Sequence, residues 1–232
     1  MPRESTPTIQ SFRVRAVRVP LADPHRTASG VIGDSPLVLT DVVTDGGVTG
    51  HSVLFTYTPA ALGPRAELVR NLEELVRGDA LARVHGLSLV RLLGGAAKPM
   101  RPYGAVGYDG EEGSARVAEG WAKRGCAPST AKVSNGSRNR RWPTTTRATR
   151  GSRVRRTRRF SVAGIRMSNH LWPEVSARLL CCTPTAHWLE YVDWWNPVLA
   201  EPLAIEKGMA IVDERAGSGI EWNEEAVQRF AL

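Results

Sequence analysis

The stretch VAGIRMSNHLWPEVSARLLCCTPTAHWLEYVD, residues 162–193, decides how the rest of the chain is interpreted. Residues 162–165 form a short apolar run, and the segment after Pro173 carries apolar residues at the spacing of an amphipathic helix. A second short strand is expected to end at Glu190. The pattern predicts strand, loop, helix and strand, with His170 just after the first strand. In barrels of alternating strands and helices, the carboxyl ends of the strands carry the chemistry.

The N-terminal part of the chain predicts a small α+β unit. Three strands are expected, at residues 12–19, 37–44 and 48–57. Asp45-Gly46-Gly47 is typical of a hairpin turn between the last two strands. Residues 20–34 are rich in Pro, Gly, Asp and Thr, and we interpret them as a loop. Leucines and valines at helical spacing over residues 68–76 predict a helix, which Gly78 ends.

The remaining elements are expected to be short. We predict helices at residues 79–93 (interrupted near Gly86), 111–123 and 224–230, and strands at residues 101–105, 198–205 and 209–213. A turn is expected at Lys207-Gly208, between the last two strands. Trp194 and Trp195 are expected to pack where the N-terminal unit meets the barrel strands.

The middle of the chain differs from the rest in charge. Between Gly120 and Pro173 there are 14 Lys and Arg residues and no Asp or Glu. The remainder has 31 − 14 = 17 basic residues against 23 acidic ones, so the net charge of +8 is local. Residues 126–160 have almost no apolar periodicity, and we expect this segment to be disordered because it buries too little apolar surface.

Composition excludes several classes of protein. The three cysteines, two of them adjacent, give neither a disulfide framework nor a zinc spacing. The N-terminus has no apolar signal region, and no apolar run approaches the ~20 residues of a membrane span. We therefore expect a cytoplasmic protein without a membrane partner.

Three segments carry a resemblance to a known family. Residues 168–180 (SNHLWPEVSARLL) and 183–203 (TPTAHWLEYVDWWNPVLAEPL) resemble the last two barrel strands of the mandelate racemase group, in the mandelate racemase / muconate lactonizing enzyme family of the enolase superfamily. Residues 14–59 resemble the capping domain of that group, and residues 79–95 resemble the segment that leads into its barrel. The resemblance covers about two thirds of the chain.

The resemblance implies an α/β fold with an α+β cap. The capping domain is expected over residues 1–97 and is completed by residues 196–232, and an incomplete (β/α) barrel is expected over residues 98–195. From Met100 to Glu190 there are about ninety residues. One βα unit with its next strand takes ~30 residues, which allows roughly three units against eight in a full barrel. An internal deletion is also expected near residue 78, where relatives carry a longer helical stretch.

The resemblance also implies a reaction, the abstraction of a proton next to a carboxylate, with the enediolate held by Mg²⁺. His170 in SNHLWPE corresponds to the base on the seventh strand. Glu190 in HWLEYVD corresponds to the donor of a hydrogen bond to the substrate carboxylate, so its pKa should be raised. His51 and Tyr57 lie on the cap, where relatives cover the substrate with a mobile loop. We predict that both contact substrate, although ordinary strand and loop roles fit them equally well.

Other parts of the family's site have no counterpart in this sequence. Lys132 stands alone where relatives have a Lys-x-Lys motif. The absence of acids between Gly120 and Pro173 removes the three carboxylates that hold the metal and the Asp partner of the His. We therefore expect no metal ligands and no bound Mg²⁺. The racemase, epimerase or dehydratase reaction on a small 2-hydroxy carboxylate is then ancestral, and this chain is degenerate and inactive.

Alternatives remain open at this point. Taken without the motif, His170 is typical of a structural loop histidine and Glu190 of a solvated carboxylate. The ten arginines between residues 138 and 159 are also typical of nonspecific binding to nucleic acid or another polyanion. A shifted reading frame gives the same composition, and the nucleotide sequence decides between these origins. An open barrel fragment further predicts low stability, aggregation or association into a homo-oligomer.

Overall fold

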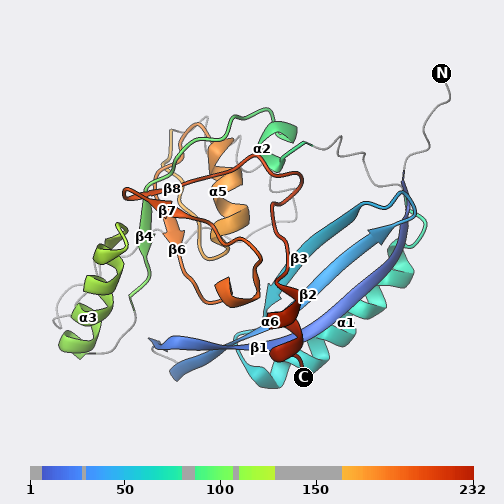
Figure 1. Cartoon of the computed structure of the whole chain (residues 1–232), viewed down its shortest axis with the longest axis horizontal. Helices are drawn as coiled ribbons and strands as arrows, with labels where there is room; N and C mark the ends of the chain where they lie inside the picture. The colour runs from blue at the N-terminus through green and yellow to red at the C-terminus, as the bar shows by residue number, and fades with distance from the viewer. Residues whose placement is uncertain (1–6, 28–29, 80–86, 107–109, 129–163) are drawn as a thin grey trace.

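The computed structural model describes residues 7–27, 30–79, 87–106, 110–128 and 164–232. An antiparallel sheet in the order β1-β2-β3 consists of β1 (Ile9–Thr27), β2 (Gly30–Thr44) and β3 (Thr49–Phe55). It is followed by a 3-10 turn η1 (Pro59–Ala61) and the helix α1 (Leu62–Val76). In Figure 1, α1 runs along one face of this sheet, while the rest of the chain lies on the other face.

The sheet forms because its central strand alternates between two apolar layers. Leu37 and Leu39 of β2 are fully buried on the side of the C-terminal segments, whereas Val38 is buried against Leu62 and Ala66 of α1. Successive side chains of a strand point to opposite faces, so one strand supplies both layers. The expected strands, the helix and the turn at residues 45–47 are confirmed, with Gly47 in the left-handed region at φ 74°.

The predicted loop at residues 20–34 is wrong over its described residues. β1 and β2 continue as a hairpin, in which Pro20 pairs with Asp34 and Thr27 pairs with Gly30. The register shifts between Pro20 and His25, and such an irregularity accommodates prolines, which cannot donate to a ladder. Pro and Asp in this stretch are therefore signs of an irregular hairpin and not of a loop.

The second sheet is a short parallel one in the order β5-β4-β6. It consists of β4 (Pro102–Gly104), β5 (Ala127–Pro128) and β6 (Leu189–Tyr191). The helices α3 (Gly110–Lys123) and α5 (Pro173–Cys181) accompany these strands. A parallel sheet with connecting helices is the beginning of a barrel that the described residues do not complete, so the predicted fold class is confirmed.

Four predicted elements differ from the structure. Of the strand at residues 162–165, the first two lie outside the described residues, Gly164 and Ile165 are not in a strand, and only Met167 forms a bridge, with Ala186. Of the helix at residues 79–93, residues 80–86 are not described, and α2 spans only Leu89–Leu92. The strands at 198–205 and 209–213 shrink to β7 (Ile205–Glu206) and β8 (Met209–Ala210), after a 3-10 turn η2 (Asn196–Val198). Pro202 interrupts the first of these because it lacks an N–H group.

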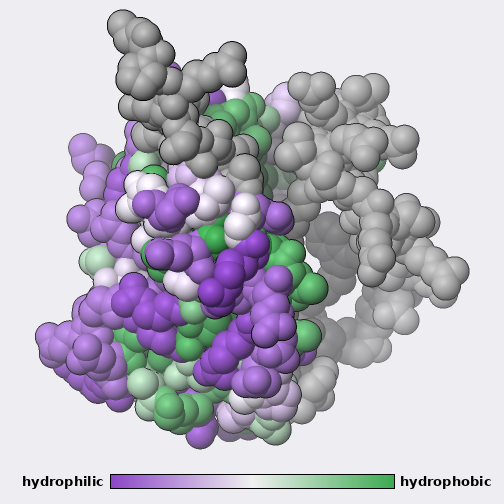
Figure 2. All heavy atoms as spheres, turned by 90° about the vertical axis from the view of Figure 1, so that its right-hand side faces the viewer, coloured by the Kyte–Doolittle hydropathy of each residue, from purple (hydrophilic) through white to green (hydrophobic). Residues whose placement is uncertain are grey.

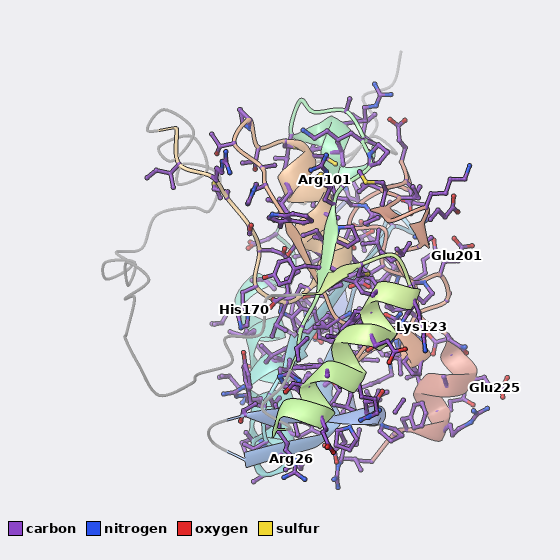
Figure 3. The ribbon with its side chains drawn as sticks, turned by 90° about the vertical axis from the view of Figure 1, so that its left-hand side faces the viewer. Arg26, Arg101, Lys123, His170, Glu201 and Glu225 are labelled. Atoms are coloured by element: carbon purple, nitrogen blue, oxygen red, sulfur yellow. The ribbon has the colours of Figure 1, made fainter. Side chains whose placement is uncertain are left out.

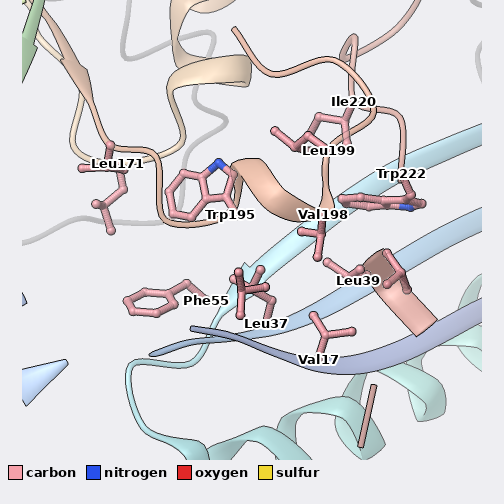
Figure 4. Packing of buried hydrophobic residues seen from close by; sticks show 13 residues of the cluster. Val17, Leu37, Leu39, Phe55, Leu171, Trp195, Val198, Leu199, Ile220 and Trp222 are labelled. Atoms are coloured by element: carbon pink, nitrogen blue, oxygen red, sulfur yellow. The ribbon is translucent and has the colours of Figure 1, made fainter. Parts of the chain in front are cut away.

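The C-terminal residues pack on the cap sheet. The cluster that joins the two contains Val17, Val19, Leu37, Leu39, Phe55, Leu171, Val192, Trp195, Val198, Leu199, Ile220, Trp222 and Val227. Figure 4 shows the side chains of Trp195 and Val198 facing Leu37 across this junction. The helix α6 (Glu224–Arg229) follows, and Ala231 bridges to Val17 of β1. Trp195 thus packs where the expectation placed it.

Apolar side chains also reach the surface. Leu68, Leu72 and Leu75 of α1 are 61%, 43% and 75% exposed. On the face seen in Figure 2, hydrophobic residues lie in patches between polar ones. None of the described helices is long and apolar enough to cross a membrane.

Candidate functional site

The loop before α5 has an unusual backbone. Leu171 and Trp172 both have a φ of 57°, in the left-handed region that non-glycine residues rarely adopt. Each such residue costs roughly 1–2 kcal/mol relative to a right-handed backbone. Hydrogen bonds offset this cost, because Ser176 Oγ and Asn169 Nδ2 both donate to the Leu171 carbonyl at 3.0 Å. Hydrogen bonds from a residue before Leu171 and from a residue after it therefore stabilise the turn.

This turn directs His170 and the next backbone amide at the same carboxylate. His170 Nδ1 lies 3.0 Å from Glu190 Oε2, and the Leu171 amide donates to that same oxygen at 2.5 Å. Asn169 fixes the backbone of Glu190 by accepting from its amide at 2.6 Å and donating to its carbonyl at 3.0 Å. The Glu190 side chain is 12% exposed and that of His170 76% exposed, and His170 lies at the edge of the molecule in Figure 3.

The two groups shift each other's titration. The hydrogen bond to the Glu190 carboxylate raises the pKa of His170, against burial, which lowers it. Burial raises the pKa of Glu190, but hydrogen bonds from His170, the Leu171 amide and Tyr103 outweigh it, so the pKa ends below its usual range. Burial and the charge of Glu190 raise the pKa of Tyr103 to about 12, so its hydroxyl keeps the proton that it donates. The site holds a carboxylate facing an imidazole that readily carries a charge.

Two features of this site differ from the sequence-based expectation. Glu190 has a lowered pKa, whereas a glutamate that donates to a substrate carboxylate requires a raised one. Its carboxylate also lies against His170 Nδ1, a pairing that the sequence did not predict. Sequence reasoning also missed Tyr103 and Asn169. The position of Asn169 next to His170 is a sequence signal that could have indicated a role in the site. The pairing of Tyr103 with Glu190 depends on the register between two strands, which the sequence does not reveal.

His51 belongs to a different cluster, on the cap sheet. It pairs with Asp41 across β2 and β3, and its Nδ1 lies 2.8 Å from Asp41 Oδ1. The Asp41 side chain is fully buried and also accepts from Arg13 Nε at 2.8 Å, Arg15 Nη2 at 2.9 Å and Trp222 Nε1 at 2.5 Å. Burial raises the pKa of Asp41, and these donors together lower it further than burial raises it. His51 therefore contacts the cap, through Asp41, and the C-terminal segment, through the ring of Trp222.

Tyr57 lies at the end of the cap sheet. Its φ is 62°, its side chain is 56% exposed, and its ring centroid lies 4.5 Å from that of Phe55. Among the described residues, no hydrogen bond joins Tyr57 or His51 to His170 or Glu190. The structure brings together two of the four predicted site residues.

A cavity of about 690 Å³ lies near the carboxyl end of β4. The end of the β1–β2 hairpin, α3 and the loop after β6 line it, including His25, Ala105, Arg116 and Trp194. None of the four predicted site residues lines this cavity. It is therefore separate from the pair formed by His170 and Glu190.

The described residues of the site do not fit Mg²⁺. This ion requires several oxygen ligands, carboxylates above all. The carboxylate of the site, Glu190, already accepts from His170, Leu171 and Tyr103. In the parts of the chain that the structure describes, no three His, Cys, Asp or Glu residues lie close enough together to hold a metal.

Comparisons with known proteins agree with this architecture. Residues 9–78 match the family described as the mandelate racemase / muconate lactonizing enzyme N-terminal domain. An enolase from Bradyrhizobium, solved with magnesium and mandelic acid, is 24% identical, with 99% of this chain and 100% of that chain covered and a TM-score of 0.73. L-Talarate dehydratase from Polaromonas sp. JS666, solved with Mg and L-glucarate, is 14% identical, with 97% and 98% covered and a TM-score of 0.75.

A third solved structure extends the comparison. L-Talarate/galactarate dehydratase from Salmonella typhimurium LT2, liganded with Mg and L-lyxarohydroxamate, is 12% identical, with 100% and 95% covered and a TM-score of 0.73. At such identities the likeness concerns the fold. The expected resemblance is confirmed: residues 9–78 match the mandelate racemase / muconate lactonizing enzyme N-terminal domain family, and the chain shares the fold of these solved enolase and dehydratase structures.

Proposed function

We propose that this chain is a mandelate-racemase-like protein that retains the histidine of a proton-transfer site and has lost the magnesium-dependent reaction. The observation that carries the proposal is the 3.0 Å contact between His170 Nδ1 and Glu190 Oε2. A carboxylate on one ring nitrogen fixes the tautomer and leaves the other nitrogen free to exchange a proton. The ligand class is a small 2-hydroxy carboxylate, since the solved relatives include complexes with mandelic acid and L-glucarate.

The chemistry that remains is limited. Charged His170, with its exposed ring, attracts the carboxylate of such an acid, and neutral His170 can accept a proton through Nε2. A proton next to a carboxylate is weakly acidic, so its removal requires stabilisation of the enediolate by a metal or by strong hydrogen-bond donors. The described site offers the hydroxyl of the half-buried Tyr103, which is already engaged with Glu190. We therefore expect binding without racemisation, epimerisation or dehydration.

His51 and Tyr57 remain proposed contacts to the ligand from the side of the cap. The ring of Tyr57 is 56% exposed and lies just after the end of β3, where it packs on Phe55. His51 is more restricted, since Asp41 holds one of its ring nitrogens. Loss of affinity for mandelate on Tyr57→Ala, with His170 unchanged, is the expected sign of this role.

The test is hydrogen exchange at the α-carbon of mandelate in D₂O, followed by NMR with and without MgCl₂. We expect exchange no faster than in protein-free buffer, and a shift of the His170 ring signals as mandelate is added. His170→Ala should abolish the binding signal. The matched control is His187→Ala, because His187 is another exposed histidine of the same stretch and contacts Trp188 rather than Glu190.

Two outcomes contradict the proposal. Magnesium-dependent exchange that disappears in His170→Ala means that catalysis survives. An absence of any shift at His170 with mandelate or glucarate means that the site does not bind the proposed ligand class. Either result is clear without knowledge of the physiological substrate.

A second candidate function rests on the basic segment alone. Residues 138–159 lie outside the described residues, but their ten arginines and lack of acids favour binding to a polyanion. A gel shift with random-sequence DNA that weakens steeply with salt and disappears on deletion of residues 138–159 is the expected sign of this function. A shift that survives the deletion contradicts it.

A further inference from the structure

The left-handed turn at Leu171 and Trp172 depends on an aromatic contact below it. The indole of Trp172 stacks on that of Trp195, with centroids 4.3 Å apart and planes inclined by 23°. Trp195 is 1% exposed and belongs to the cluster that joins the C-terminal segments to the cap sheet. The buried indole of Trp195 therefore fixes the position of Trp172, and with it the turn that carries His170.

Glu174 fixes the indole of Trp195 through a hydrogen bond. Trp195 Nε1 donates to Glu174 Oε2 at 2.8 Å, and Glu174 is 4% exposed at the start of α5. Its other oxygen, Oε1, is buried and has no hydrogen-bond partner among the described residues.

The surroundings of Glu174 contain two cations, Arg178 and Arg215, but neither forms an ion pair with its carboxyl. Arg178 Nη1 donates to the Glu174 backbone carbonyl at 2.8 Å, and the Arg178 guanidinium pairs with Asp213. Arg215 also pairs with Asp213, at 2.6 Å. Burial raises the pKa of Glu174, and Trp195, the Glu174 amide and the two arginines lower it by less. The pKa of Glu174 therefore lies above its ordinary value, and its carboxyl accepts from the Trp195 indole.

We infer that Glu174 is a positioning residue for His170. By binding Trp195 it fixes the stack with Trp172, and the stack fixes the turn that holds the His170 ring and the Leu171 amide against Glu190 Oε2. When Glu174 no longer accepts from Trp195, the turn relaxes and His170 loses its contact with Glu190. The imidazole then titrates as an ordinary exposed histidine.

This inference rests on the site described under the proposed function but not on its chemistry. The titratable group that contacts His170 is Glu190 from β6, which also accepts from Tyr103 of β4, and Glu174 forms no hydrogen bond with His170. A change in His170 on alteration of Glu174 is therefore transmitted through the turn. The measurement needs no ligand, so it can fail while the binding experiment succeeds, or the reverse.

The experiment is an NMR titration of the His170 ring in the full-length chain and in three variants. Glu174→Gln keeps the size and the accepting oxygen, and we expect the His170 pKa to stay raised. Glu174→Leu removes the acceptor, and Trp195→Phe removes the donor while keeping a ring for Trp172. In both, we expect the His170 pKa to fall to the value of an unpartnered histidine. If Glu174→Leu does not fold, Trp195→Phe carries the test.

The matched control is Leu180→Ala, which lowers stability from the same helix without touching Trp172 or Trp195. Leu180 is 4% exposed and belongs to the other core cluster. It should leave the His170 pKa raised at an equal loss of melting temperature. The inference is overturned if the pKa stays raised in folded Trp195→Phe, or if Leu180→Ala lowers it as much.

Discussion

The exposed imidazole of His170 titrates abnormally because its partner is not exposed. Glu190 is mostly buried, and the Leu171 amide and the Tyr103 hydroxyl fix its charge in place. A carboxylate held in this way attracts a proton to His170 even though most of the ring faces solvent. The effect belongs to single groups at fixed positions, and single substitutions should therefore reveal it.

Glu190→Gln is expected to lower the pKa of His170 to its ordinary value. The raised pKa adds stability that is complete below pH 6.5, the unperturbed value, and is lost as pH rises through the folded-state pKa. The variant should not show this loss of stability at rising pH. NMR titration of the ring and urea unfolding across pH measure the two effects. An unchanged pKa in the variant is incompatible with the observed contact.

Asp41→Ala is expected to be strongly destabilising. The buried carboxylate neutralises Arg15 and accepts from His51 and Trp222, so its removal leaves buried donors without a partner. We expect a loss of about 3 kcal/mol in the free energy of unfolding, measured with urea. The control is Asp34→Ala, which breaks a more exposed pair with Arg18 and should cost about 0.5 kcal/mol. Equal losses contradict this assignment.

Acid should weaken the same cluster. The lowered pKa of Asp41 contributes stability above pH 3.8, its unperturbed value, and this contribution disappears as pH falls through the folded-state pKa. Asp213 has a lowered pKa as well, since Arg215 and Arg178 outweigh its burial. Both groups should steepen the acid side of the stability profile. In Asp41→Ala that side should be flatter.

At the scale of elements, turns decide where strands stop. The two-residue turn between β7 and β8 places both Lys207, at φ 48°, and Gly208, at φ 75°, in the left-handed region. Such turns favour Asn-Gly, because asparagine tolerates this backbone better than lysine does. The turn forms where the sequence predicted it, although the strands that it joins are much shorter than expected.

Lys207→Asn is expected to stabilise the chain by about 0.5–1 kcal/mol, since it reduces the strain of the left-handed residue. The measurement is the urea midpoint at constant slope. Lys207→Ala is the control for loss of the charge, and it should give no gain because alanine suits the left-handed region no better than lysine. A gain of the same size in both variants points to charge and not to backbone.

At the scale of the whole molecule, the barrel is a fragment. The described parallel sheet has β4 between β5 and β6, whose outer edges are largely unpaired in the described part of the chain. Apolar residues of α1 are also exposed, as given above. Open edges and exposed leucines favour association and aggregation over a well-defined monomer.

We therefore expect the purified chain to unfold at low temperature, to aggregate, or to be stable only as an oligomer. Analytical ultracentrifugation and thermal unfolding at several protein concentrations distinguish these cases. A melting temperature that rises with concentration indicates self-association. A cooperative monomer with the melting temperature of an ordinary mesophilic domain contradicts the expectation.

Magnesium should not stabilise the chain. A site occupied at one hundred times its dissociation constant adds about 2.7 kcal/mol to the free energy of unfolding. We expect no shift of the melting temperature between millimolar MgCl₂ and EDTA at equal ionic strength. A shift of the size that such a site produces contradicts the argument from the donor set of the site.

The sequence by itself determined the type of fold and indicated two residues of the site, His170 and Glu190. Local patterns can be recognised from the sequence without the tertiary structure. Such patterns mark the strands around residues 37–44 and 49–55, the helix after them and the SNHLWPE motif. The same patterns also predicted a strand at residues 162–165 before His170, but its described residues Gly164 and Ile165 are not in a strand. The boundaries at residues 97, 98 and 195 and the roles of His51 and Tyr57 remain predictions.

Only the tertiary structure decided what these residues do to one another. The register that sets Tyr103 opposite Glu190, the left-handed turn at Leu171, and the indole of Trp195 on Glu174 are contacts between segments far apart in the chain or states of the backbone that packing imposes. The charge of Glu190 follows from them, because a pKa depends on burial and on donors within a few ångströms. Residue order specifies neither, so the lowered pKa of Glu190 and its contact with His170 come from the tertiary structure, and its role as a donor to substrate remains a prediction.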